Sequence, residues 1–106
     1  MNVQFTARHF HASPELQENM TEDVLALQQF YSNIIDAHVI LEQHKSSRSA
    51  EIKVNILNKT VSAHAEEENM GKAVEKVLER IQRQLKKENE LLKSHKGNPT
   101  ADLIEG

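Results

Sequence analysis

The stretch NMGKAVEKVLERIQRQLKKENELLKS, residues 69–94, predicts the longest element of the chain and decides how the rest is arranged. It contains no proline, and its one glycine, Gly71, stands near its start. At about 100° per residue, the rotation of an α-helix, its apolar residues fall within an arc of roughly 100°. The stretch therefore predicts an amphipathic helix whose apolar face packs on a sheet, formed by Met70, Val74, Val77, Leu78, Ile81, Leu85 and Leu92.

The other side of the same helix is basic. Five cations fall within roughly 80° on the helical wheel: Lys72, Lys76, Arg80, Arg83 and Lys87. A basic stripe of this kind follows backbone phosphates and releases counterions when it binds RNA or DNA. A charge run on a helix is also typical of a solvated face, with Glu75 and Glu79 pairing with cations three or four residues away. The composition leaves both interpretations open.

Formal net charge is −3, but the charges are divided along the chain. Residues 1–68 hold five Lys or Arg and ten Asp or Glu, whereas residues 69–96 hold eight and four. An anionic partner responds to the field within about a Debye length, roughly 10 Å, so the local excess matters more than the total. Residues 14–31 contain four acids and no Lys or Arg. Such an acidic segment could focus an RNA site, mark a protein partner or balance the surface.

The remaining segments predict four strands and a first helix. Alternating apolar and polar residues predict strands at 2–8, 35–41, 50–56 and 60–65. In the second strand, the alternation places Ile35, Ala37, Val39 and Leu41 on the core side and Ile40 on the polar side. Short connections predict that the last three strands form an antiparallel meander, with Asn58 able to adopt the left-handed conformation in a tight turn.

The sequence Ser13-Pro14-Glu15 marks the start of the first helix, with Ser13 as N-cap, and the helix is expected to run to about residue 31. The predicted fold class is therefore α+β, in the order βαβββα. Two helices are expected to cover the apolar face of one four-stranded sheet and to leave the other face to water. We expect one domain over residues 1–96 and a flexible tail over 97–106.

Several function classes are disfavoured. The chain has no cysteine, its three glycines form no phosphate-binding loop, and no catalytic motif is visible, so we expect no enzyme and no cofactor. His9 and His11 would supply two ligands where zinc usually takes three or four, so we expect exposed histidines and no metal. No apolar run approaches the roughly 20 residues of a membrane span, and no signal peptide is visible, so we expect a cytoplasmic protein.

Three segments together resemble a known pattern: VSAHAE at 61–66, Asn69-Met70 followed by Ala73-Val74, and LERIQRQLKK at 78–87. They are similar to the ribosome hibernation promoting factor and ribosome-associated inhibitor A family, also known as sigma-54 modulation proteins. The resemblance covers residues 1 to about 96, with Asn69 where the family usually has Asp. It implies the same βαβββα order, in a layout like that of double-stranded-RNA-binding domains.

The resemblance also implies a function. Family members are stress factors that bind the decoding region of the small ribosomal subunit, where messenger and transfer RNA would sit, and silence translation by occlusion. By position, the family's basic residues on the last helix match Arg80, Arg83, Lys86, Lys87 and Lys93. Lys72 and Lys76 are included only because they lie on the basic side of the helical wheel.

In the first helix, Asp23 and Ala26 stand roughly where family members have lysines. Without the second domain of long members, the chain resembles a short form. We expect a monomer that binds the small subunit and its ribosomal RNA, and neither DNA nor membrane. The alternative is a protein-interaction module that uses its acidic first helix.

Overall fold

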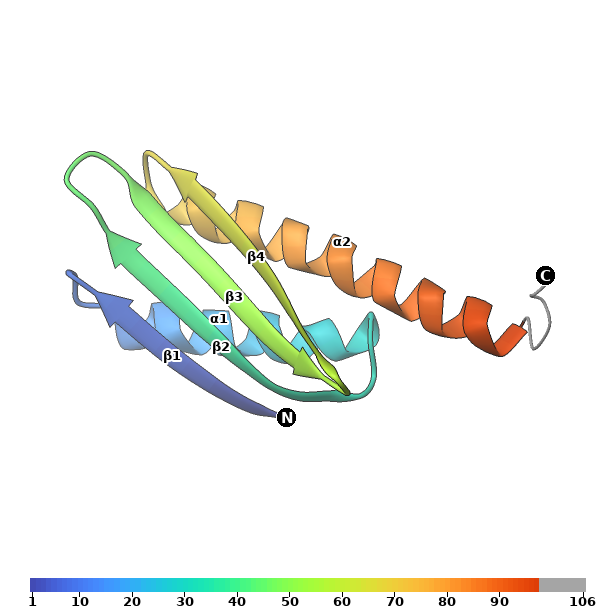
Figure 1. The fold of residues 1–106 in the computed structure, drawn as a ribbon. Helices are drawn as coiled ribbons and strands as arrows, with labels where there is room; N and C mark the ends of the chain where they lie inside the picture. Colours follow the sequence, from blue (N-terminus) through green and yellow to red (C-terminus); the bar gives the residue numbers. More distant parts are fainter. Residues whose placement is uncertain (98–106) are drawn as a thin grey trace.

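The computed structural model of the chain describes residues 1–97, with side chains described through residue 92. Its elements follow the predicted βαβββα order (Figure 1). They are β1 Asn2–Arg8, α1 Pro14–Leu25, the 3₁₀ helix η1 Ala26–Gln29, β2 Ile34–Gln43, β3 Arg48–Ile56, β4 Lys59–Glu67 and α2 Met70–Gly97. The expected tail lies, from residue 98 onward, outside the described residues.

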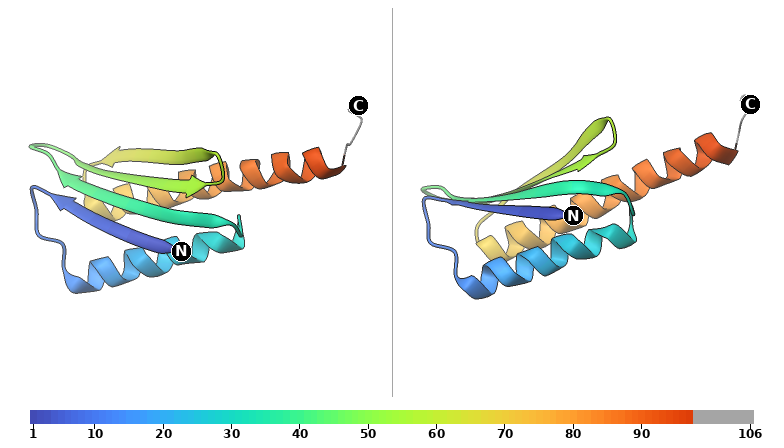
Figure 2. Two further views of the ribbon diagram at one scale, coloured as in Figure 1. Left: turned by 60° about the horizontal axis from the view of Figure 1, so that its bottom comes forward. Right: turned by 90° about the horizontal axis from the view of Figure 1, so that it is seen from below.

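The four strands form one sheet in the order β1-β2-β3-β4. Strand β1 is parallel to β2, while β2, β3 and β4 form the predicted antiparallel meander. Figure 2 shows both long helices beneath the same face of this sheet. This arrangement confirms the expected two layers and leaves β1 and β4 as the edge strands.

The predicted helix cap and the predicted tight turn form at the expected residues. The Ser13 side chain accepts a hydrogen bond from the backbone N–H of Leu16 at 3.1 Å, and Pro14 opens α1. Asn58, in the turn between β3 and β4, has φ 67°, the left-handed conformation that asparagine tolerates better than most residues. The first helix is shorter than predicted, because α1 ends at Leu25 and the chain winds into η1. Such 3₁₀ turns are common where a helix ends and its carbonyls lack partners.

One face assignment in β2 is wrong. Ile35 was predicted on the core side, but its side chain is 57% exposed, and Ile34 is buried instead. The register between β2 and β3 shifts between Ile34 and Asp36, as at a β-bulge. An extra residue reverses the alternation on one side of it, so the pattern that holds from Ala37 to Leu41 does not extend back to Ile35.

The core lies between the sheet and the two helices. Ala73, Val77, Ile81 and Leu85 of α2 are fully buried against β3 and β4. Leu92 was predicted to belong to the same face, but it is 47% exposed. Figure 1 shows the reason, because the last turns of α2 extend beyond the end of the sheet and have no strand above them. None of the described helices combines the length and apolar character needed to cross a bilayer.

Candidate nucleic-acid interface

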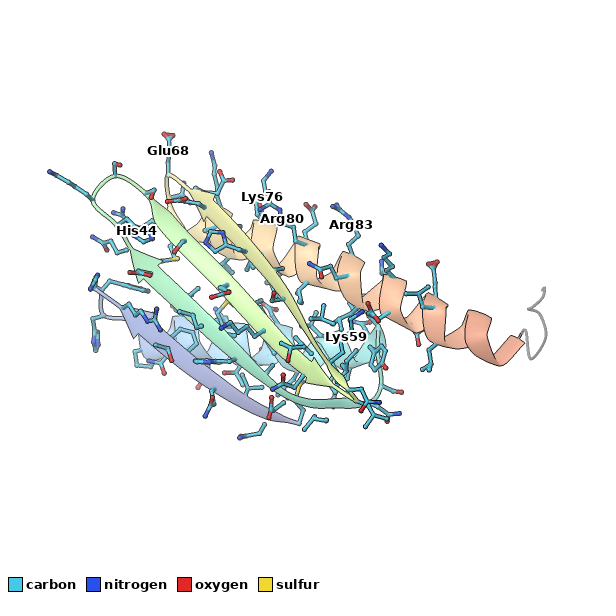
Figure 3. The ribbon with its side chains drawn as sticks, viewed as in Figure 1. His44, Lys59, Glu68, Lys76, Arg80 and Arg83 are labelled. Atoms are coloured by element: carbon cyan, nitrogen blue, oxygen red, sulfur yellow. The ribbon has the colours of Figure 1, made fainter. Side chains whose placement is uncertain are left out.

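The basic stripe of α2 faces away from the core. Lys72, Lys76, Arg83 and Lys87 are all exposed, and none of them forms an ion pair with another described side chain. In Figure 3, the side chains of Lys76 and Arg83 project outward from α2. The alternative interpretation, in which Glu75 and Glu79 pair with these cations, finds no such ion pair among the described side chains. The exposed cations of the stripe are therefore available to an anionic group.

Arg80 differs from its neighbours because it is bound to the sheet. Its Nη1 donates a hydrogen bond of 2.6 Å to the backbone carbonyl of His64 in β4. One turn later, Nε2 of Gln84 donates an equally short bond to the carbonyl of Ser62. After a further turn, Glu88 pairs with Lys59 of β4 at 2.7 Å. Because β4 is an edge strand, these three contacts cover backbone and side-chain groups that would otherwise face only water.

Lys86 and Lys93 stand apart from the stripe. The Lys86 ammonium lies 4.9 Å from the centre of the Phe30 ring, on the side of α2 that faces η1. The backbone of Lys93 belongs to α2, but its side chain lies outside the described residues. Of the seven cations predicted to bind RNA, the structure thus gathers Lys72, Lys76, Arg80, Arg83 and Lys87 along one flank and directs Lys86 elsewhere.

A groove lies between the basic stripe and the open face of the sheet. Its volume is about 420 Å³, and it is lined by Glu51, Ser62, Ala63, His64, Arg80, Arg83 and Gln84. The two arginines were predicted from the sequence as binding residues, whereas Glu51 and Gln84 were not. Gln84 follows Arg80 by four residues, a spacing that places both on one side of a helix. Glu51 is brought in by strand register, because it stands directly opposite His64.

The acidic segment lies in the same layer as the basic stripe. Glu15, Glu18, Glu22 and Asp23 are exposed on α1, and none forms an ion pair among the described side chains. Since α1 and α2 cover one face of the sheet, this layer is acidic on one helix and basic on the other (Figure 2). A polyanion placed along α2 would be repelled by the carboxylates of α1.

The histidines whose side chains are described lie apart and do not form a metal site. His9 approaches Glu42 at 3.8 Å, and His38 shares a hydrogen bond of 2.7 Å with Thr6 across β1 and β2. Among the side chains of residues 1–92, which the structure describes, no group of three or more His, Cys, Asp or Glu is placed to hold a metal ion.

Known proteins share both the sequence pattern and the fold. Residues 3–93 match the family model described as sigma 54 modulation protein / S30EA ribosomal protein. The ribosome hibernation promoting factor of Klebsiella oxytoca is 24% identical over 95 residues, which covers 90% of this chain and 100% of the relative. That of Pseudomonas putida is 27% identical over 90 residues, which covers 85% and 88%.

Solved structures of other proteins share the fold of this chain. A ribosomal subunit interface protein from Coxiella burnetii superposes with a TM-score of 0.77 at 26% identity, covering 84% of this chain and 98% of that one. The N-terminal domain of Protein Y from Thermus thermophilus shares the fold, with a TM-score of 0.74 at 19% identity over 82% and 98% of the two chains. Because the family model spans most of the chain and the βαβββα fold matches, this protein belongs to the sigma 54 modulation protein / S30EA ribosomal protein family.

Proposed function

We propose that this protein is a ribosome hibernation factor, which binds the small ribosomal subunit at the decoding region and silences translation by occupying the space of messenger and transfer RNA. The observation that carries the proposal is the match of residues 3–93 to the family, joined to an exposed basic flank on α2. The mechanism needs no bond chemistry. A folded body held in a channel by phosphate contacts excludes the substrates that use the same channel.

The partner in this proposal is ribosomal RNA, and the contact residues are the cations predicted from the sequence. Lys72, Lys76, Arg83 and Lys87 support it most directly, because their charges are exposed and lack partners among the described side chains. Arg80 retains further guanidinium N–H groups beyond the one given to His64. Lys86 and Lys93 belong to the proposed set through the resemblance alone.

We propose that the chain acts as a monomer in the cytoplasm, where ribosomes work, without catalysis and without DNA. The alternative of a protein-interaction module is not favoured by the comparisons, since the relatives carry the name of ribosome hibernation promoting factor.

The test is co-sedimentation of the purified protein with vacant ribosomes over a salt series. The stripe variant Lys76→Glu, Arg83→Glu, Lys87→Glu spares Arg80, whose bond to β4 has a structural role. A control variant with the same change in net charge is Arg8→Glu, Lys45→Glu, Lys53→Glu, at exposed positions outside α2.

We expect the wild type and the control to pellet with the small subunit and the stripe variant to stay in the supernatant. Binding of the wild type should also fall steeply with salt, as phosphate contacts require. A wild type that stays in the supernatant even at low salt would overturn the proposal and turn attention to protein partners of α1.

A further inference from the structure

The groove between β4 and α2 combines groups that a simple phosphate-binding surface does not need. Two arginines, Arg80 and Arg83, stand on the α2 side, and the half-buried carboxylate of Glu51 stands on the sheet side. Among the described side chains, no cation forms an ion pair with Glu51. A carboxylate next to an anion site weakens phosphate binding, so its presence indicates a ligand that also brings hydrogen-bond donors.

The walls of the groove are held in place before any ligand arrives. The hydrogen bond from Arg80 to the His64 carbonyl fixes the guanidinium at the rim. Gln84 is fixed by its bond to the Ser62 carbonyl, which uses an amide N–H and leaves the side-chain oxygen as an acceptor. Since these side chains are ordered by the β4 edge, little further entropy is lost when they bind a ligand.

The two sides of the groove therefore differ in chemistry. The α2 rim offers cationic donors, from Arg80 and Arg83, that suit a phosphate. The sheet side offers the carboxylate of Glu51, an acceptor that suits N–H groups, and the Gln84 oxygen adds a further acceptor from α2. A nucleotide carries both parts, a phosphate and a base whose edge includes N–H donors. A volume of about 420 Å³ falls within the range of small-ligand sites, roughly 300–1,000 Å³.

We propose that this groove is a subsite for one unpaired RNA nucleotide, whose phosphate lies on Arg80 and Arg83 and whose base donates hydrogen bonds to Glu51. This inference rests on the proposed function, in which the partner is RNA. Guanine fits best, because its N1–H and N2–H groups are adjacent donors that match the two carboxylate oxygens. Adenine and cytosine each offer an amino group, whereas the lone N3–H of uracil lies between two carbonyl oxygens that repel a carboxylate. The base must be unpaired, since pairing occupies this edge.

The inference is tested by fluorescence anisotropy with ten-nucleotide RNAs, one of uridine only and others with a single central guanosine, adenosine or cytidine. A well-made bidentate contact discriminates by about tenfold, and we expect the guanosine RNA to bind about tenfold more tightly than the uridine RNA. Glu51→Gln should reduce this ratio to about one, while its affinity for the uridine RNA stays equal or rises. Arg83→Ala should weaken binding of all four RNAs.

The matched control is Glu79→Gln, which removes the same charge from an exposed α2 position that does not line the groove. This control should keep the tenfold preference. Equal affinity of the wild type for all four RNAs, absence of binding to any of them at low salt, or an unchanged preference in Glu51→Gln would each overturn the inference.

Ribosome co-sedimentation separates failure of the inference from failure of the proposed function. If the protein pellets with ribosomes but shows no base preference, the proposed function stands and the proposed subsite is wrong. If the protein does not pellet at low salt, the proposed function is wrong, and the proposed RNA subsite is wrong with it.

Discussion

The ammonium nitrogen of Lys86 lies 4.9 Å from the centre of the Phe30 ring, so a cation of α2 is held over the aromatic residue that ends η1. This contact joins the two helical segments beneath the sheet. It also distinguishes Lys86 from the adjacent Lys87, which is exposed and forms no ion pair among the described side chains. The two neighbouring lysines therefore have different surroundings, and substitution of each one tests a different effect.

Replacing Lys86 with methionine should lower the free energy of unfolding, because the apolar stem stays and the cation–π contact is lost. A contact of this kind is worth about 0.5–1 kcal/mol at exposed sites. Lys87→Met should leave stability nearly unchanged and weaken ribosome binding more than Lys86→Met does. Urea denaturation and ribosome co-sedimentation measure the two effects. Equal loss of stability in both variants would contradict the assignment.

Removing the side chains that cover the β4 edge should promote self-association. In the double variant Arg80→Ala, Gln84→Ala, the carbonyls of His64 and Ser62 lose their donors, and an uncovered edge strand pairs readily with another chain. We also expect stability to fall by about 0.5–1.5 kcal/mol for each hydrogen bond lost. Light scattering after size exclusion measures the mass in solution.

The control for this experiment is the double variant Arg83→Ala, Lys87→Ala. It loses two positive charges from the stripe, one more than the first variant, but no hydrogen bond to β4. It should remain a monomer at every concentration at which the first variant associates, and association of both variants to the same degree would count against the role of the edge.

Exposed stripe cations should each account for about one phosphate contact. Arg83→Ala should weaken ribosome binding and lower the slope of log affinity against log salt by about one unit. Lys53→Ala, on the open face of the sheet, should leave the slope unchanged. Binding measured at four or five salt concentrations gives both slopes. An unchanged slope in Arg83→Ala would remove this residue from the RNA contact.

Asn58 should tolerate glycine and reject valine. Its φ of 67° lies in the left-handed region, which costs most side chains about 1–2 kcal/mol and glycine nothing. Asn58→Val should therefore lower Tm by several degrees, since about 1 kcal/mol shifts Tm by roughly 4–8 °C in a domain of this size. Asn58→Gly should stay close to the wild type. Thermal unfolding followed by circular dichroism checks both, and similar Tm values for the two variants would show that the turn is not strained.

Two leucines of α2 should differ in their importance for folding. Leu85 is fully buried and Leu92 is 47% exposed, although both fall on the same helix face. Leu85→Ala should cost about 2–5 kcal/mol through lost burial and a cavity, whereas Leu92→Ala should stay within about 0.5 kcal/mol of the wild type. Chemical denaturation measures both. A large cost at Leu92 would mean that the end of α2 is packed against another part of the chain.

Much of the fold could be predicted because the signals that define it are local. Alternation over residues 50–56 specifies a strand, and the apolar arc from Met70 to Leu85 specifies a helix, whatever lies around them. Ser13 and Asn58 act through their own backbone neighbours. The basic stripe was predictable for the same reason, since the angle between Lys76 and Arg83 follows from helix geometry alone.

The sequence by itself thus determined the order of elements, the two-layer arrangement and the basic flank of α2. Only the tertiary structure decided that Ile35 faces water, that Arg80 and Gln84 are bound to β4, that Lys86 covers Phe30 and that Glu51 joins the groove. The physical reason is that these outcomes depend on which segment lies next to each side chain. Strand register, a bulge and the length of the sheet relative to α2 set those neighbours, and each involves residues far apart in the chain.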